Sequence, residues 1–375
     1  MIQDDPISQF LQQAVREGVF PGAVLFVKVK GQVVYHHAVG QMGEAPYEYP
    51  TTTKTIYDLA SLTKPLVTTT AILCLVQDGS LDLDQPAAKW LTEWESTLYK
   101  ATTIRQLLHH SSGLPAYRKY FETLSPTASP PKIANERHAR FEKLLRIIAA
   151  ESMEYLPDSQ SLYSDLGFIA LGAMIERRVG SIVSDFCRDR FFDSLNVNPL
   201  FFIDAEGNPS GGDGDLTRVA PTEQDPWRGR LVHADVHDEN AYVLGGIAGH
   251  AGLFGTALSV SRISQAWLQA LLGRSSILPT TLVQQFVKRQ DFSGKSSWAL
   301  GWDTPSAPSS SGNYFSPESF GHLGYAGTSL WIDPVRELEV ILLSNRVHPT
   351  RENNQIQAFR PALHDLVINE LGNQN

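Results

Sequence analysis

The sequence predicts an α/β fold of the α+β type, with one antiparallel sheet built from both chain ends, flanked by helices and joined to a mostly helical subdomain. Two observations lead to this prediction. Runs of β-branched and aromatic residues, typical of strands, occur near both termini, whereas the middle of the chain mostly has the apolar spacing of helices. Strands this far apart in the sequence are most simply placed in a single sheet with helices packed on its faces.

The N-terminal region is expected to form a helix and then a hairpin. Apolar residues recur at helical spacing over residues 6–18. The stretch GAVLFVKVKGQVVYHHAVG, residues 22–40, is typical of two strands joined by a Lys30-Gly31 turn. The next stretch, YDLASLTKPLVTTTAILCLV at 57–76, has the pattern of an amphipathic helix that ends at Gly79.

The rest of the chain is mostly helical in pattern before it returns to strands. We predict one unit, residues 1–375, in which 1–80 and 245–375 form the α/β subdomain and 81–244 form the mostly helical subdomain. The expected elements are a mainly helical region at 100–200 with breaks at 111–115 and 125–132, loops at 204–240, a helix at about 257–273, strand-like runs at 319–334 and 337–345, and a final helix at about 353–371.

Composition and charge limit the partners that the protein can have. The chain has 375 residues, of which 42% are hydrophobic and 19% charged, a composition that supports a large folded core. The net charge is −9 and no run of Lys or Arg occurs, which argues against binding to nucleic acid or to anionic membranes. A small-molecule substrate is therefore expected, whereas the oligomeric state is not predicted.

The N-terminus and the cysteines bear on the cellular compartment. The segment MIQDDPISQF has neither the basic nor the apolar region of a signal peptide, and no run of 18 apolar residues occurs. The sequence therefore predicts a cytoplasmic protein, or a periplasmic one if a leader was removed. Cys74 and Cys187 lie in apolar helical patterns without metal-type spacing, so neither a metal centre nor a disulfide framework is expected.

Ser61 and Lys64 form an S-x-x-K pair at the start of the apolar helix. Residues three apart on a helix lie on the same face, so the amine is expected within reach of the hydroxyl. The helix N-terminus favours negative charge, which suits an oxyanion formed at Ser61. Lys64 would accept the serine proton, or hold a neighbouring base in its charged form, if partial burial lowers its pKa. The alternative is that Ser61 only caps the helix and Lys64 is a solvated surface residue.

Two further polar triplets accompany this pair. Tyr163-Ser164-Asp165 begins the apolar run LGFIALGAMIERRVG, and His322-Leu323-Gly324 lies on an expected strand near the C-terminus. In this order the three elements resemble those of the serine β-lactamase and penicillin-binding protein superfamily, whose S-x-x-K, S-D-N or Y-x-N, and K-T-G motifs follow one another along the chain. The resemblance is strongest to class C β-lactamases, to their esterase relatives and to low-molecular-mass D,D-peptidases.

The resemblance extends from about residue 20 to residue 345 and implies a β-lactamase/transpeptidase-like fold. It is supported by the stretches YDLASLTK, LLHHSSGLP, VHDENA, GGIAGHAGLFGTA and GTSLWIDP. It also implies acyl transfer through a covalent ester of a serine, followed by hydrolysis, with neither a metal nor an organic cofactor.

The resemblance assigns roles to individual residues. Ser61 would be acylated, Lys64 would assist its deprotonation, and the Tyr163 hydroxyl would shuttle a proton between the nucleophile and the leaving group. The phenol requires nearby cations to lower its pKa, and Lys64 and His322 are the candidates. The oxyanion hole would consist of the backbone N–H groups of Ser61 and Tyr325, with Gly324 keeping the strand edge open for the substrate.

Departures from the family pattern bear on the substrate. Asp165 replaces the Asn of Y-x-N, which removes an amide donor that would hold a substrate amide; an alternative role for Asp165 is to keep Lys64 protonated. Leu323 replaces the hydroxyl residue of the third motif, and His322 stands where a fixed cation is usual. These changes favour an ester or small amide over a carboxylate-bearing substrate, and they predict slow turnover of β-lactams. Reading Ser164-Asp165-Leu166 as S-D-N fails at its third residue.

Other functions remain open from the sequence alone. A D,D-carboxypeptidase or β-lactamase differs from the esterase-like hydrolase in substrate and requires an exported protein. A non-catalytic ligand-binding protein would keep the fold without turnover. A metal hydrolase would have to use the histidines of HADVHDEN, residues 233–240, together with His109, His110 and His250, but their spacing is not that of a metal site. His109 and His110 are instead expected to cap a helix and pack under the site. The glycines at 246, 249, 252 and 255 indicate close backbone packing.

Overall fold

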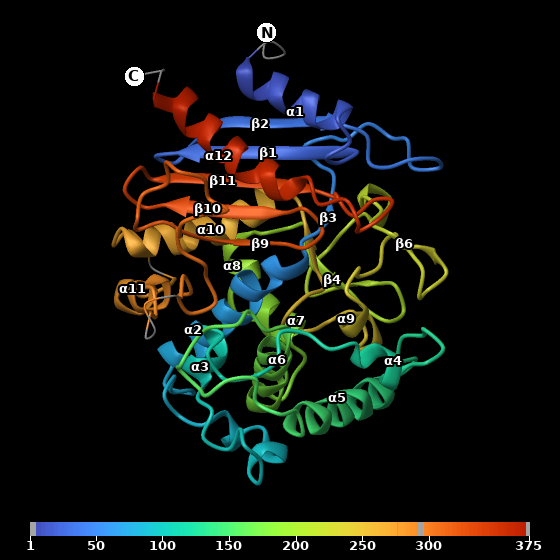
Figure 1. Cartoon of the computed structure of the whole chain (residues 1–375), viewed down its shortest axis with the longest axis vertical. Helices are drawn as coiled ribbons and strands as arrows, with labels where there is room; N and C mark the ends of the chain where they lie inside the picture. Colours follow the sequence, from blue (N-terminus) through green and yellow to red (C-terminus); the bar gives the residue numbers. More distant parts are fainter. Residues whose placement is uncertain (1–4, 276, 292–293, 295, 373–375) are drawn as a thin grey trace.

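In the computed structural model, a five-stranded antiparallel sheet is formed by the two ends of the chain. The structure describes residues 5–275, 277–291, 294 and 296–372. In Figure 1 the blue N-terminal strands lie beside the orange and red C-terminal ones. The strand order is β2-β1-β11-β10-β9, with bounds β1 Gly22–Val29, β2 Gln32–Gly40, β9 Phe320–Leu323, β10 Ser329–Asp333 and β11 Leu338–Ser344.

The alternation of side chains along β1 explains why both faces of this sheet are covered. Leu25 and Val27 face one cluster of buried residues, which includes Leu11 of α1 (Pro6–Arg16) and Leu363 of α12 (Ile356–Gly372). Val24 and Phe26 face the opposite cluster, which includes Ile263 of α10 (Ala257–Leu271). Successive strand residues point to opposite faces, so a strand that is apolar throughout requires helices on both sides.

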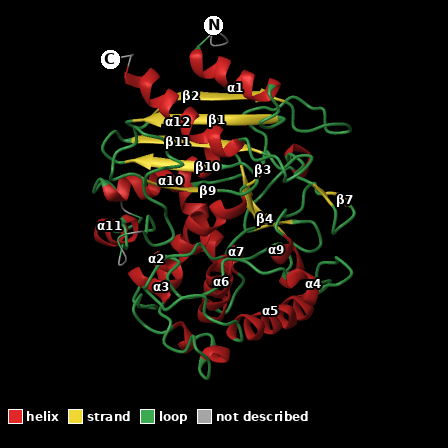
Figure 2. Ribbon diagram, in the orientation of Figure 1, coloured by secondary structure: helices red, strands yellow, loops and turns green. Residues whose placement is uncertain are grey.

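Helices connected by long loops fill the region below the main sheet in Figure 2. A smaller antiparallel sheet of order β3-β8-β4-β5 joins the candidate nucleophile segment, residues 57–69, to the glycine-rich stretch that follows residue 245. The remaining bounds are β3 Tyr57–Asp58, β4 Leu200–Ile203, β5 Pro209–Ser210, β6 Gln224–Asp225, β7 Arg230–Leu231, β8 Leu253–Gly255, α2 Thr70–Gln77, α3 Ile104–Leu108, α4 Tyr120–Leu124, α5 Ala134–Ala149, α6 Asp165–Val179, α7 Val183–Cys187, α8 Asp193–Leu195, α9 Glu239–Val243 and α11 Thr280–Val287.

The structure confirms the predicted sheet, the hairpin about Lys30-Gly31, the helix near 257–273 and the terminal helices. It differs over 319–334, where a turn divides the expected single run into β9 and β10, and at α11, which was not predicted. The N-terminal segment is described only from Asp5 onward, so residues 1–4 lie outside the described chain. The boundaries proposed for the two subdomains stay a prediction.

The segment predicted as one helix over 57–76 is irregular in its first half. It begins with β3, forms a 3₁₀ turn at Ala60–Leu62 and a π-helical turn at Lys64–Thr69, and becomes α-helical only at Thr70. The stretch Ala60–Gln77 is long and apolar enough to cross a membrane, but 83% of it is buried inside the fold. Its apolar character is therefore explained by core packing. Cys74 and Cys187 are both free and buried.

Candidate active site

The backbone just before Ser61 is held in a tight bend. Ala60 has a φ of +48°, in the left-handed region that side chains with a Cβ rarely adopt. The buried carboxylate of Asp58 stabilises this bend, because it accepts a hydrogen bond from Ala60 N at 2.8 Å and another from His237 N at 2.7 Å. Pro65 follows at the start of the π-helical turn, where its missing N–H removes no helical hydrogen bond. Ser61 thus lies at a fixed turn.

Lys64 connects the serine to the rest of the site. Its side chain is completely buried, and Nζ donates to Ser61 Oγ at 3.0 Å and to His250 O at 3.0 Å. The same nitrogen lies 2.6 Å from Oδ1 of Asp165, whose side chain is 19% exposed. The expected contact between Ser61 and Lys64 is therefore present, and a carboxylate completes it.

The protonation of Lys64, which the sequence left open, depends on its two polar neighbours. Burial alone lowers the pKa of Lys64, but the charge and hydrogen bonds of Asp165 and Tyr163 outweigh burial and raise the pKa above its ordinary value. The condition under which Lys64 would accept the serine proton as a free amine, a pKa lowered by burial, is therefore not met, because the ion pair outweighs burial. Lys64 is an ammonium at neutral pH, as the alternative role of Asp165 implied.

Tyr163 lies beside this pair at the start of α6. Ser164, the next residue, caps the helix: its Oγ accepts from Gly167 N at 3.3 Å and donates to Pro115 O at 2.6 Å. With its hydroxyl occupied in this way, Ser164 is not the functional hydroxyl of this motif, which supports Tyr163. The Lys64 ammonium is 5.0 Å from the centre of the Tyr163 ring.

Burial raises the pKa of Tyr163, and the charge of Lys64 and hydrogen bonds with Lys64 and Ser61 offset this only in part. The phenol is therefore protonated at neutral pH. In this state it is a proton donor, which suits transfer of a proton to a leaving group rather than removal of one from Ser61.

Two residues that sequence reasoning did not assign to the site pack against Tyr163. The ring of His110 lies 4.7 Å from the Tyr163 ring, and its Nδ1 accepts from Ser164 N at 3.1 Å. Trp298 lies 5.3 Å from Tyr163 and 4.5 Å from His110. Packing of His110 under the site was predicted, but the hydrogen bond by which it fixes the second motif was not. No motif surrounds Trp298.

The third motif lies on β9, at one edge of the main sheet. The ring of His322 is 5.9 Å from that of Tyr163, and its Nδ1 lies 2.7 Å from Leu323 O. Burial, with the charge of Lys64, lowers the pKa of His322 to about 3. His322 is therefore neutral at pH 7, and the expectation that it supplies a second cation to Tyr163 was wrong.

Gly324 lies where β9 passes the nucleophile segment. A Cβ at this position would lie 2.6 Å from Leu59 O and would also collide with the Thr328 side chain. Only glycine permits this approach, which keeps the strand edge close to Ser61. Tyr325, the next residue, is half-exposed and stacks on His237 with ring centres 5.9 Å apart.

The glycine-rich stretch packs beneath Lys64, as predicted. A Cβ on Gly249 would lie 2.8 Å from the Cα of Gly172, so α6 and this stretch are in backbone contact. Thr68 Oγ1 donates to Gly249 O at 2.6 Å. Close packing at Gly249 therefore places the neighbouring carbonyl of His250 within reach of the Lys64 ammonium.

The histidines considered for a metal site have separate partners. His237 Nε2 lies 2.9 Å from Glu223 Oε2, and His250 Nε2 lies 2.9 Å from Asp238 Oδ1. His233 bonds to a backbone carbonyl of Val219. Within the described part of the chain, no group of three or more His, Cys, Asp or Glu side chains is arranged to hold a metal ion.

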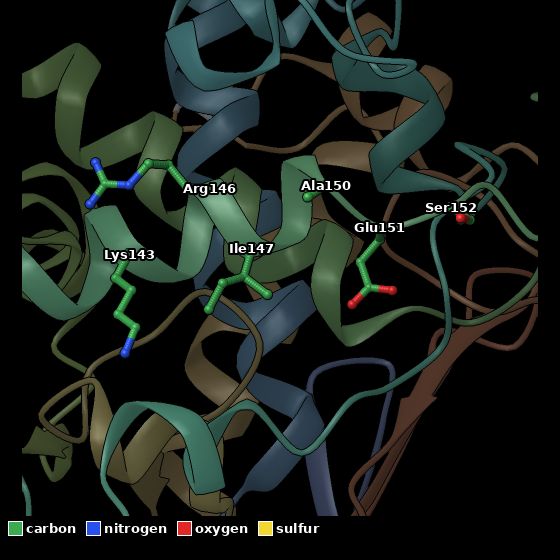
Figure 3. Close-up of a pocket in the computed structure, with 6 residues that line it drawn as sticks. All are labelled: Lys143, Arg146, Ile147, Ala150, Glu151 and Ser152. Carbon is green, nitrogen blue, oxygen red and sulfur yellow. The ribbon is translucent and has the colours of Figure 1, made fainter.

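A surface hollow of about 560 Å³ lies at the C-terminal end of α5. Its six lining residues, shown in Figure 3, include Lys143, Arg146 and Glu151. None of them belongs to the three motifs, so this hollow is separate from the candidate active site.

Residues 7–361 match the protein family described as Beta-lactamase. The chain belongs to the beta-lactamase family. A protein of Escherichia coli (strain K12) named "Putative D-alanyl-D-alanine carboxypeptidase" is 29% identical over 371 residues, which cover 91% of this chain and 82% of the relative. The chain is therefore a serine hydrolase of the β-lactamase-like family, as the three motifs predicted.

Solved structures support the same fold. An octameric penicillin-binding protein homologue from Pyrococcus abyssi superimposes with a TM-score of 0.72 at 22% identity, covering 97% of this chain and 77% of that one. EstCE1, described as a hydrolase with promiscuous acyltransferase activity, gives a TM-score of 0.71 at 20% identity and covers 96% and 97% of the two chains. The predicted β-lactamase/transpeptidase-like fold class is confirmed.

Proposed function

We propose that this serine hydrolase works by acylation and deacylation of Ser61 and that its substrate is an ester or a small amide. The observation that carries the proposal is the contact of Lys64 Nζ with both Ser61 Oγ, at 3.0 Å, and Asp165 Oδ1, at 2.6 Å. A hydroxyl in contact with this ion pair can pass its proton to the pair as the hydroxyl oxygen attacks a carbonyl carbon.

The protonation states suggest the path of that proton. As Ser61 attacks, Lys64 takes the serine proton and passes one of its own to Asp165, so the pair changes from ammonium and carboxylate to ammonium and carboxylic acid. Tyr163 gives its phenolic proton to the leaving group and regains one from the pair. The serine proton is thereby transferred in net terms to the leaving group, and the acyl group remains on Ser61 until water removes it.

The negative charge on the tetrahedral intermediate requires donors. We assign this role to the backbone N–H groups of Ser61 and Tyr325, which belong to the nucleophile segment and to the turn after β9. The Gly324 approach to Leu59 supports the assignment, since it holds these two segments together.

The surroundings of the site favour a substrate without a carboxylate next to the scissile bond. His322 is neutral, Leu323 has no hydroxyl, and Asp165 places a negative charge where relatives have an amide. A substrate carboxylate would be repelled by the charge of Asp165, and the third motif would offer it neither a cation nor a hydroxyl donor. We therefore propose slow or negligible turnover of β-lactams.

A second candidate is a D,D-carboxypeptidase. It is favoured by the name of the Escherichia coli relative, which matches over 91% of this chain. Its substrate would carry the terminal carboxylate that the third motif does not recognise in the usual way, so the two candidates make opposite predictions about penicillin, which mimics such a substrate.

Intact mass measured after brief mixing separates these candidates. The protein is mixed with a short-chain nitrophenyl ester and, in parallel, with a penicillin, and Ser61→Ala is the control. We expect an acyl adduct with the ester that is absent from the variant. An adduct with the penicillin alone would move the assignment to a penicillin-binding enzyme. If neither reagent labels the protein, the proposal of acylation at Ser61 is wrong and a ligand-binding role takes its place.

A further inference from the structure

Helix α12 places a buried guanidinium behind the turn that follows β9. Arg360 is only 6% exposed, and its Nη2 donates to Gly324 O and to Thr328 O, both at 2.7 Å. In Figure 1, α12 crosses the face of the main sheet, far along the sequence from the three motifs. One side chain therefore holds both ends of the 324–328 turn.

The first of these bonds acts directly on a proposed oxyanion donor. The carbonyl of Gly324 and the N–H of Tyr325 belong to the same peptide group. A strong donor on the carbonyl oxygen draws electrons from the amide, which makes the N–H a better donor in turn. Gly327 N also donates to Gly324 O, at 3.1 Å. The carbonyl thus receives two hydrogen bonds, one of them from a charged group.

The charge of Arg360 is not neutralised by a neighbour. In the described part of the chain no carboxylate pairs with its guanidinium, and its buried Nε has no hydrogen-bond partner. Burial, with the charge of Arg346, lowers the pKa of Arg360 to about 9, which still leaves it protonated at pH 7. A neutral donor would bind the same carbonyls without the cost of burying an unpaired cation. Packing and hydrogen bonding alone therefore do not explain a charged side chain at this position.

We propose that Arg360 is a positioning residue for the oxyanion hole. It fixes the 324–328 turn and polarises the peptide group between Gly324 and Tyr325 toward the negative charge that develops on the substrate oxygen. The inference rests on the proposed function, in which Tyr325 N–H is one of the two oxyanion donors. The polarised N–H of Tyr325 should stabilise the negatively charged transition state and should not tighten binding of the neutral substrate.

The test compares Arg360→Gln and Arg360→Lys with a matched variant, Arg346→Gln. Arg346 also donates to the turn, from Nε to Tyr325 O at 3.0 Å, but that carbonyl is one peptide group further along, and its amide N–H belongs to Ala326. Three quantities are measured for each protein: kcat and KM with a nitrophenyl ester, and affinity for an alkyl boronic acid, which forms a tetrahedral adduct with the serine. Thermal melting reports on folding.

We expect Arg360→Gln to lower kcat and boronic acid affinity in parallel by about 10- to 100-fold, with KM changed by less than about three-fold. Arg360→Lys restores part of both losses because it keeps the charge. Arg346→Gln loses less than Arg360→Gln in boronic acid affinity.

Unchanged boronic acid affinity in Arg360→Gln, or an equal loss in Arg346→Gln, overturns the inference in favour of a structural role. If Arg360→Gln does not fold, Arg360→Lys decides, since its two losses must still be parallel. The wild-type protein separates the two proposals. Absence of Ser61-dependent acylation there refutes the proposed function, whereas normal acylation that is insensitive to Arg360 refutes only this inference.

Discussion

The nucleophile side and the edge-strand side of the site both bury a basic side chain, and they differ in how its charge is compensated. On the nucleophile side, Lys64 forms an ion pair with Asp165 at 2.6 Å. On the edge-strand side, the hydrogen bonds of Arg360 to described residues all go to backbone carbonyls. Its neighbours there are two imidazoles, of His322 and His364, whose pKa values burial lowers to about 3 and about 4.

This difference suggests that one side of the site transfers protons and the other stabilises charge. A buried acid–base pair can exchange a proton internally, because its two forms differ little in net charge. An unpaired cation has no partner to which it can pass a proton, but its constant positive charge can stabilise a negative charge nearby. We infer that the nucleophile side transfers protons while the edge-strand side stabilises negative charge. Two predictions test that division, and a third tests the burial of the neutral imidazole of His364 beside Arg360.

The largest effect is expected from Asp165→Asn, which keeps the size of the side chain and removes its charge. Without this acceptor, acylation of Ser61 by an ester should fall by about 100- to 1,000-fold at pH 7. Burial is then opposed only by Tyr163 among the groups that raise the pKa of Lys64, so this pKa falls. The rate should therefore recover partly as pH rises and the free amine forms. Single-turnover acylation measured across pH checks both statements. A rate at pH 7 equal to or above that of the wild type would show that the amine needs no carboxylate partner.

A smaller effect is expected from Gly324→Ala on the edge-strand side. The added methyl group collides with Thr328 and Leu59 and pushes β9 away from the nucleophile segment. Acylation should fall by about 10- to 100-fold, because a displacement of even 1 Å weakens a preorganised donor. Gly372→Ala, where the added methyl meets nothing within 4 Å, is the matched control for steady-state kinetics. Equal activity of both variants would rule out a close approach of β9 to the reacting atoms.

The smallest effect concerns stability. The folded-state pKa of His364 is about 4, below its unfolded value, so the unfolded chain takes up a proton that the native protein does not as pH falls from 6.5 toward 4. Stability is thus lost on acidification, by about 2 kcal/mol at pH 5 for this residue. His364→Gln should remove that part of the pH dependence in urea titrations. His138→Gln, at a side chain that is 76% exposed, is the control and should leave that pH dependence in place. The prediction is contradicted if the free energy of unfolding changes with pH equally in the two variants.

The sequence predicted the elements that local patterns specify. The hairpin follows from its strand residues around Lys30-Gly31, and motifs with fixed spacing suggested Ser61, Lys64, Tyr163 and Gly324 as candidate site residues. The irregular start of the helix at 60–69 was missed because its apolar pattern fits an α-helix equally well. The bend at Ala60 depends on Asp58, whose bond to His237 joins distant parts of the chain.

The electrostatics of the site were the least predictable part. The protonation of Lys64 depends on whether Asp165 lies within ion-pair distance, and that of His322 depends on complete burial; neither is encoded locally. Arg360 and Trp298 lie in no motif and reach the site only through the packing of α12 and of the segment before β9. Long-range contacts of this kind need the three-dimensional structure.

The position of α12 has a consequence for the folding of the chain during its synthesis. Ser61 leaves the ribosome early, whereas β11 must be made before β1 gains its second neighbour, and α12 must dock before the turn after β9 acquires Arg360. A sheet assembled from both ends of a chain can only close late in synthesis. The segment of Ser61 would therefore be synthesised well before the turn after β9 is complete, and proteolytic loss of α12 would remove the Arg360 hydrogen bonds from that turn and weaken hydrolysis.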